Sequence, residues 1–317
     1  MRCAALFLAL MLAALQAAAW GPRGHQTSVA IAEALIAGSR AERELRALLQ
    51  PAGWTLADAA QRPDCLRGVG RPSSGPPECR VFSADDLAAA VAGFEGACGP
   101  RIPPEACHRR LHYTDVAIQR EAWRPGLAGT READIVGALG AAIAVLQDQP
   151  PPGPPRFASK REALAWLAHL VGDLHQPLHV GALYLDAGGQ PIDPDHTPHG
   201  PTHDTAGGNR LQLGERNLHS LWDAAPPISV NAALLAEARA LPRPSGAAAG
   251  WPAQWASETL GVARQALSPL RFSPARGDPP QWTQRSPDDA ATREALQRRQ
   301  LLRAGARLAQ LLQAIWP

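Results

Sequence analysis

Several features that would place the chain in a familiar class are missing. Its 31 Lys and Arg residues nearly balance its 29 Asp and Glu residues, so no basic excess is present to bind nucleic acid by phosphate neutralisation alone. No apolar run reaches the roughly 20 residues that a bilayer-spanning helix needs. The absence of any Cys-x-x-Cys pair argues against zinc held by thiolates. No alternating strand pattern is long enough to organise a sheet, so we expect a helical protein.

The first 19 residues have the organisation of a secretory signal peptide. Arg2 precedes an apolar run from Ala4 to about Leu15, and a short run of alanine follows. We expect cleavage after Ala19, which makes Trp20 the N-terminus of a secreted or periplasmic protein.

The mature chain keeps an even number of cysteines, which in an exported protein predicts disulfides. They are Cys65, Cys79, Cys98 and Cys107. Four cysteines allow three pairings, and the sequence leaves the choice open. All of them lie in residues 62–111, an irregular stretch rich in proline and glycine with one predicted helix from Ser83 to about Phe94. We expect this stretch to be a cross-linked excursion from the main body, since its own core is small.

Helical periodicity accounts for most of the remaining chain. Predicted helices cover residues 24–36, 41–49, 54–61, 130–149, 159–175, 231–240, 251–267 and 290–315, and a shorter one covers 219–223. Thr130 is the expected N-cap of its helix, because acidic residues fill the first turn that follows it. Residues 181–208 are expected to form a long loop. The predicted fold for residues 20–317 is therefore a single all-α domain, a helical bundle with long loops.

The strongest chemical signal lies in residues 166–180. On a helix, His169 and Asp173 are four residues apart, so their side chains project from the same face. Pro177 ends that helix and lets His179 approach from another direction. A carboxylate among apolar neighbours needs a cation or strong donors nearby. Zinc, which accepts nitrogen from His and oxygen from Asp, suits this set.

Further stretches offer matching ligands. Trp20, once N-terminal, presents its α-amine and its carbonyl oxygen as a chelating pair, and His25 is close to it in sequence. His219 and Asp223 repeat the spacing of the first pair. A single His-x-x-x-Asp pair is usually a salt-bridged pair on a helix, but several such sets together indicate a metal site.

His112 heads another candidate segment, His-Tyr-Thr-Asp. The histidine can bind a metal, and the ring of Tyr113 can stack on a base. Asp115 can orient a ligand without touching the metal. The alternative interpretation is an ordinary polar loop.

Taken together, these motifs resemble the zinc-dependent single-strand nucleases, the type I nucleases of fungi and plants, which belong to the phospholipase C/nuclease superfamily and have bacterial relatives. The resemblance is carried by Trp20 with His25, His-Tyr at 112–113, HLVGDLHQPLH from 169, Gly-Gly-Asn at 207–209 and LHSLWD from 218. It extends over nearly the whole mature chain.

The resemblance implies a secreted endonuclease with three zinc ions, which hydrolyses single-stranded DNA and RNA to 5′-phosphorylated products. One ion would be held by Asp58, His112, His169 and Asp173, a second by Trp20, His25 and Asp173, and a third by His179, His219 and Asp223. Asp173 would bridge the closest pair of ions. Tyr113 falls where the family stacks a base, and Asn209 falls where it contacts phosphate.

The chain departs from the family around the first carboxylate ligand. That ligand usually follows Trp-Ala or Trp-Pro, and an arginine usually stands three residues later. Asp58 would be the ligand and would orient the attacking water, but Gln61 stands three residues after it. Arg62 comes next and would assist the developing charge. Asp64 and Asp86 remain alternatives to Asp58.

The resemblance leaves two rival functions. A zinc-dependent phospholipase C has the same N-terminal tryptophan and metal scaffold, but it typically ends the third site with His-x-x-x-Glu, where this chain has Asp223. A secreted zinc-binding or adhesion protein without catalysis is the other. We expect single-stranded nucleic acid or nucleotides as substrate, no membrane association and no obligate protein partner. The preference for DNA or RNA, 3′-nucleotidase activity and the oligomeric state stay open.

Overall fold

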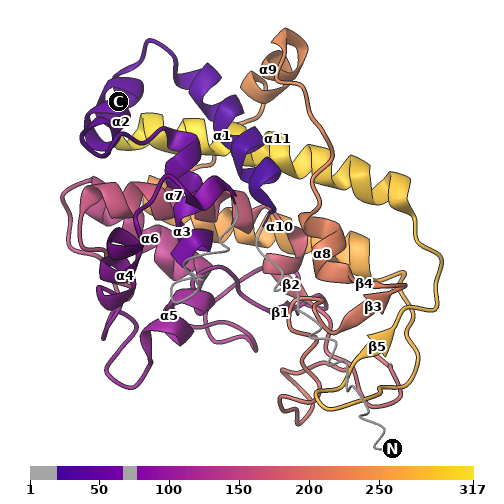
Figure 1. The fold of residues 1–317 in the computed structure, drawn as a ribbon. Coiled ribbons are helices and arrows are strands. Elements are labelled where there is room, and N and C mark those ends of the chain that lie inside the picture. Colours follow the sequence, from indigo (N-terminus) through magenta and orange to yellow (C-terminus); the bar gives the residue numbers. More distant parts are fainter. Residues whose placement is uncertain (1–19, 67–76) are drawn as a thin grey trace, which may run out of the picture.

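The computed structural model describes residues 20–66 and 77–317, so the expected signal peptide lies outside the described residues. As predicted, the described chain is mostly helical (Figure 1). Its α-helices are α1 (Pro22–Ile36), α2 (Arg40–Leu49), α3 (Leu56–Leu66), α4 (Ala84–Ala92), α5 (Pro104–Arg110), α6 (Ile135–Leu146), α7 (Lys160–Leu174), α8 (Leu218–Asp223), α9 (Ala232–Arg239), α10 (Trp251–Leu267) and α11 (Ala290–Ile315). Short 3-10 turns cover Gln50–Ala52, Pro77–Cys79, Pro177–His179 and Ala248–Gly250. The strands are β1 (Val116–Ala117), β2 (Gly181–Ala182), β3 (Leu211–Leu213), β4 (Arg216–Asn217) and β5 (Trp282–Thr283).

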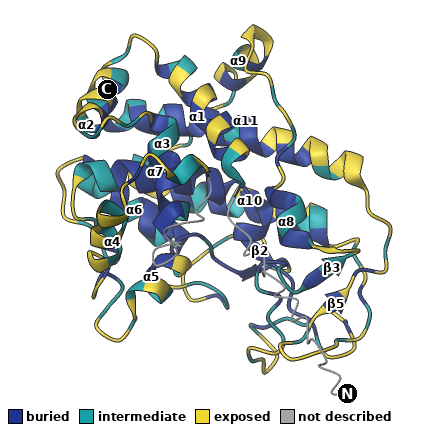
Figure 2. Cartoon of the chain, in the orientation of Figure 1, coloured by how far each residue is buried: buried dark blue, intermediate teal, exposed yellow. Residues whose placement is uncertain are grey.

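Helix α7 lies in the middle of the bundle. It contacts α3, α6, α10 and α11, and every residue from Ala163 to Leu174 is buried (Figure 2). The helix begins where the hydroxyl of Ser159 accepts a hydrogen bond from the backbone N–H of Glu162, which satisfies a donor that the first turn leaves open. A helix that is apolar on all sides must be surrounded, so its polar residues His169 and Asp173 are carried into the interior.

Helices α1 and α11 pack closely against each other, although they come from opposite ends of the described chain (Figure 1). A Cβ atom at Gly305 of α11 would lie 2.5 Å from the Cβ atom of Ile31, so this approach requires glycine. The contact fixes α1, which carries His25, against the body of the protein.

The strands are short and form two small sheets. Strand β1 pairs in parallel with β2, and just before this pair the backbone N–H of Thr114 donates to the carbonyl oxygen of His179 at 2.8 Å. The segment that follows His112 is thereby joined to the segment that contains His179. Strand β3 lies between β4 and β5, and this sheet contacts α8.

Some details differ from the sequence predictions. Helix α6 begins at Ile135 rather than at Thr130, because the carboxylate of Asp134 accepts hydrogen bonds from the backbone N–H groups of Val136 and Gly137. Helix α5 was not expected. The disulfides, left open by the sequence, join Cys65 to Cys79 and Cys98 to Cys107.

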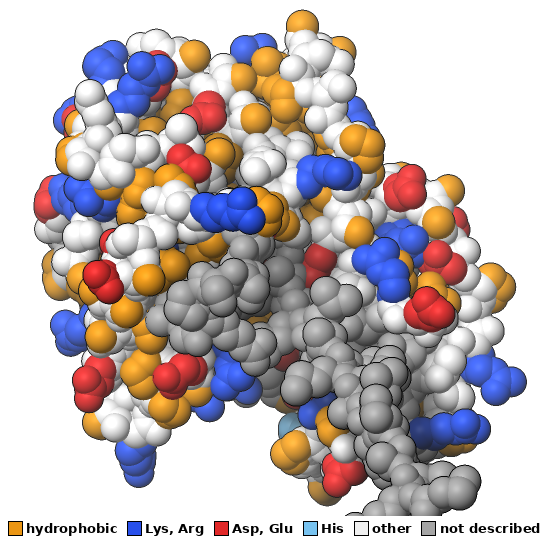
Figure 3. All heavy atoms as spheres, viewed as in Figure 1, with side chains coloured by type: hydrophobic (Ala, Val, Ile, Leu, Met, Phe, Trp, Pro, Cys, Tyr) orange, Lys and Arg blue, Asp and Glu red, His pale blue; other side chains and the backbone are white. Residues whose placement is uncertain are grey.

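In the part of the chain that the structure describes, no helix combines the length and the apolar character needed to cross a membrane. Charged side chains of both signs are interspersed on the face seen in Figure 3, in agreement with the net charge of +2.

Candidate metal centre

Three histidines surround the carboxylate of Asp173 at the end of α7. The Nε2 atom of His169 and the Nδ1 atom of His112 each lie 3.0 Å from Oδ2 of Asp173. The Nε2 atom of His25 lies 3.4 Å from Oδ1. All of these side chains are buried, so the expected convergence of α1, α7 and the His112 segment on one carboxylate is present.

The small residue before Asp173 makes this convergence sterically feasible. A Cβ atom at Gly172 would lie 2.9 Å from Nδ1 of His25, which is closer than a side chain allows. The buried Trp20 lies at the same place, since its indole N–H donates to the carbonyl oxygen of Gly172 at 2.9 Å. The backbone N–H of Gly21 donates to the carbonyl oxygen of Asp223 at 3.0 Å, so Trp20 and Gly21 contact both segments that carry a His-x-x-x-Asp pair.

A second His-Asp set lies beside the first. The Nε2 atom of His219 lies 3.5 Å from Oδ2 of Asp223. The ring centroids of His179 and His219 are 5.0 Å apart, with the ring planes tilted by 34°. The amide of Gln176 donates to Oδ1 of Asp223 at 2.8 Å. His179 also lies near the first set, with its Nδ1 atom 3.7 Å from Oδ2 of Asp173.

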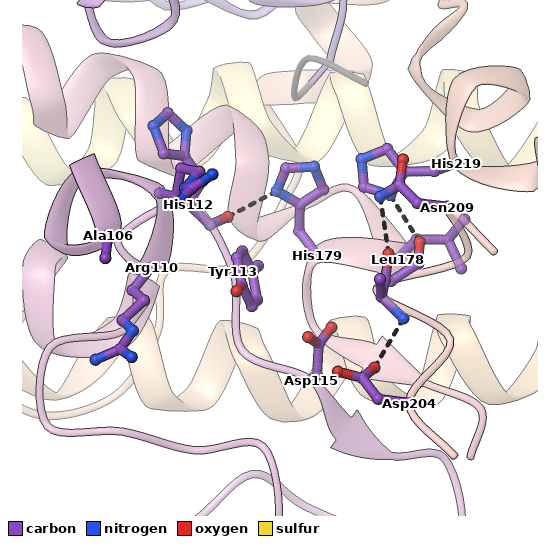
Figure 4. A pocket seen from close by; sticks show the side chains of 13 residues that line it. Ala106, Arg110, His112, Tyr113, Asp115, Leu178, His179, Asp204, Asn209 and His219 are labelled. Carbon is purple, nitrogen blue, oxygen red and sulfur yellow. Dashed lines mark hydrogen bonds between the residues drawn. The ribbon is translucent and has the colours of Figure 1, made fainter. Parts of the chain in front are cut away.

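Backbone carbonyl oxygens orient three of the histidine rings. Nδ1 of His169 lies 2.7 Å from the oxygen of Ala60. Nδ1 of His179 lies 2.7 Å from that of His112, and Nδ1 of His219 lies 2.6 Å from that of Gly207 (Figure 4). A carbonyl oxygen only accepts hydrogen bonds, so Nδ1 carries the proton in each ring. The neutral imidazole then has its lone pair on Nε2, the tautomer that a metal requires.

The electrostatics of the first set favour a positive charge. Burial by itself would lower the pKa of His169, but the nearby carboxylates of Asp173 and Asp64 outweigh burial and raise this pKa above its usual value. A cation placed among these side chains would meet the same attraction.

The structure places Asp64, and not Asp58, next to the histidines. Oδ1 of Asp64 lies 3.8 Å from Nε2 of His169. The carboxylate of Asp58 accepts hydrogen bonds from the backbone N–H of Thr55 at 2.8 Å and from its hydroxyl at 2.6 Å. In return, the backbone N–H of Asp58 donates to that hydroxyl at 3.0 Å, the reciprocal arrangement that caps the start of a helix.

Arg62 is likewise engaged away from the histidines. Its Nε donates to Glu162 at 3.1 Å, and its terminal nitrogens contact the carboxylate of Asp86. The guanidinium carbon also lies 4.7 Å from the ring centroid of Trp54. These contacts join α3, α4 and α7, so both Arg62 and the alternative ligand Asp86 belong to a contact that supports the fold.

The donor atoms form three groups in which all ligand atoms lie within 4.8 Å of one another. The groups are His112, His169 and Asp173; His25, Asp64 and His169; and His179, His219 and Asp223. Imidazole nitrogen with carboxylate oxygen is a donor set that zinc accepts, so the residues fit the expected metal. None of the groups found among the described residues includes the loop histidines His196, His199 or His203.

A cavity of about 430 Å³ opens beside these groups. His112, His179 and His219 lie along one side, and the expected substrate-binding residues Tyr113, Asp115 and Asn209 also line the cavity (Figure 4). The guanidinium carbon of Arg131 lies 6.0 Å from the ring centroid of Tyr113, an arrangement that holds the ring by a cation–π contact.

Asp115 has an unusual environment at the far end of the cavity. The side chain is buried, and burial together with the nearby charge of Asp204 raises its pKa well above the usual value. At the rim, the backbone of Ala206 adopts a left-handed conformation with φ of 51°, held by the carboxylate of Asp204, which accepts from the Ala206 N–H at 2.7 Å. This turn places Gly207 and Asn209 against the cavity.

Comparison with known proteins agrees with this geometry. A family model described as S1/P1 Nuclease matches residues 20–317, a span that includes every side chain of the metal centre and the cavity. The search of curated proteins gave no match.

Proposed function

Because the chain belongs to the S1/P1 nuclease family, we propose that it is a zinc-dependent endonuclease that cleaves single-stranded DNA and RNA and leaves 5′-phosphorylated products. The observation that carries this proposal is the meeting of the histidine and aspartate groups around Asp173 at the wall of a cavity that also contains Tyr113. A 3′-nucleotidase activity would use the same residues.

Three zinc ions are proposed, with Asp64 in the place first given to Asp58. The ligands of the first would be Asp64, His112, His169 and Asp173; those of the second Trp20, His25 and Asp173; and those of the third His179, His219 and Asp223. When bound, such ions lower the pKa of water and neutralise the charge of the phosphodiester. The sequence around Asp64 also fits the family pattern, in which the carboxylate often follows proline and an arginine stands three residues later: Pro63 precedes Asp64, and Arg67 follows at that distance. Arg67 lies outside the described residues.

The chain's own residues would bind and orient the substrate. Tyr113 would stack on an unpaired base, which accounts for a preference for single strands, since duplex stacking withholds that face. Asp115 would contact the edge of the base. Asn209 donates one amide N–H to the carbonyl oxygen of Ala206 at 2.8 Å, which leaves a second amide N–H for a phosphate oxygen.

Export is part of the proposal. Removal of residues 1–19 would free the α-amine of Trp20, whose indole already lies against the residue before Asp173. The two disulfides fit an oxidising compartment. N-terminal sequencing of the exported protein is expected to begin at Trp20.

The experiment is a substrate panel on the processed, zinc-loaded protein. We expect rapid cleavage of single-stranded DNA and RNA, slower cleavage of duplex DNA and no hydrolysis of phosphatidylcholine. The D173N variant is expected to lose bound zinc and hydrolysis together, because its carboxylate meets three histidines. A fully metallated, active D173N enzyme would refute the bridging role. Hydrolysis of phosphatidylcholine with intact DNA would support a phospholipase, and zinc binding without turnover would support a non-catalytic protein.

A further inference from the structure

The cavity beside the metal centre has walls of opposite charge. Helix α5 contributes Arg109 and Arg110 to one wall, whereas Asp115 and Asp204 line another part. Figure 4 shows Arg110 on the α5 side of Tyr113, with both aspartates on the side away from it. Arg131 contacts the Tyr113 ring but does not line the cavity. The arginines that do line the cavity therefore lie on one side of that ring.

In the part of the chain that the structure describes, Arg109 and Arg110 make no side-chain contact of the kind by which an arginine stabilises a fold. Among residues 20–66 and 77–317, neither side chain takes part in an ion pair or a hydrogen bond. By contrast, Arg62 contacts Glu162 and Asp86, and Arg120 contacts the carboxylates of Asp193 and Asp195. Guanidinium groups without such partners are free to bind an anionic ligand. Phosphate suits them, because two N–H groups of one guanidinium can donate to two phosphate oxygens at once.

Helix α5 is held firmly relative to the metal ligands. The disulfide between Cys98 and Cys107 fixes it within the excursion. Its buried His108 packs against Trp166 of α7, with ring centroids 5.0 Å apart, and Arg110 is separated from His112 only by the buried Leu111. The excursion thus presents its arginines at a set position beside the site of hydrolysis.

We propose that Arg109 and Arg110 form a phosphate subsite that binds the linkage next to the one being cleaved. This inference rests on the proposed nuclease function and deepens it, because it makes the enzyme selective for chains of nucleotides over substrates with a single phosphate. The subsite also gives the disulfide-linked excursion a function, which is to carry cationic side chains to the cavity.

The test compares substrates that differ by one phosphate. The zinc-loaded enzyme is assayed on a dinucleoside monophosphate and on the same molecule with one further phosphate at its 5′ end or its 3′ end. For the wild type we expect kcat/KM of diester cleavage to be about tenfold higher on at least one phosphorylated form, the gain of one charge-assisted hydrogen bond. R109A/R110A is expected to lose this preference while its kcat/KM on the dinucleoside monophosphate changes less than twofold.

Matched variants separate the subsite from a general charge effect. R101A removes an exposed arginine of the same excursion that does not line the cavity, and we expect it to keep the full preference. R110K retains the positive charge but lacks the paired N–H donors of a guanidinium, so it should keep part of the preference for the phosphorylated substrate. Loss of the preference in R101A as well, an unchanged preference in R109A/R110A, or no preference in the wild type would each overturn the subsite. A wild type that cleaves none of these substrates, nor single-stranded DNA, would instead overturn the nuclease function itself.

Discussion

At the scale of single residues, the environment of a carboxylate decides its role more than its type does. Asp58 and Asp64 lie on the same short helix, α3. Asp58 faces the start of the helix and accepts from Thr55, whereas Asp64 faces His169 on α7. The sequence offered both as metal ligands, and the orientation of α3 against α7 brings Asp64 beside His169.

This distinction predicts opposite results for two conservative substitutions. We expect D64N to lower the zinc content and the activity, since the amide removes a charged ligand. D58N should keep its zinc and its activity and should lose about 1 kcal/mol of stability, because it weakens a helix cap. Zinc analysis and thermal unfolding of the two purified variants check this. If D58N lost its zinc and D64N kept a full complement, Asp58 would be the carboxylate ligand after all.

At the scale of elements, a buried arginine joins three helices. Arg62 of α3 is only 3% exposed and contacts Glu162 of α7 and Asp86 of α4. The side chain of Glu162 is only 14% exposed, so removing Arg62 would leave this carboxylate without its cation, whereas Asp86 is 41% exposed and stays in contact with water. The contact ties the start of the disulfide-linked excursion to the central helix.

We therefore expect R62A to be a stability variant. The free energy of unfolding should fall by roughly 3 kcal/mol, while the activity of each folded molecule stays within about twofold of the wild type. Denaturant unfolding and kcat measured well below the midpoint test this, with R80A, which removes an exposed arginine of the same excursion, as the control. A large loss of kcat at unchanged stability would show that Arg62 acts on the substrate.

At the scale of the whole molecule, the candidate metal centre connects segments that are far apart in the chain. Four of its histidines come from different places: His25 from α1, His169 from α7, His219 from α8, and His112 from the segment that follows α5. Asp173 lies among His25, His112 and His169. A metal that binds the folded chain and not the unfolded chain stabilises the fold by mass action. Zinc is therefore expected to hold the bundle together as well as to support hydrolysis.

Removal of zinc tests this coupling. We expect chelation to abolish activity and to lower the midpoint of thermal unfolding by roughly 5–15 °C, the effect of about 4 kcal/mol in a protein of this size. Added zinc should restore both properties, and added magnesium should not, since it prefers oxygen ligands. An unchanged midpoint in a sample shown to be metal-free would contradict the coupling.

The helical class, most of the helix positions and the histidines that meet near Asp173 could be predicted from the sequence, because apolar periodicity and the spacing of His169, Asp173 and His179 are local properties of the chain. The disulfide pairing, the contact between Asp64 and His169 and the contacts of Arg62 could be seen only in the folded chain. Each of these depends on how one element lies against another, and that is set by packing between segments that no local pattern connects.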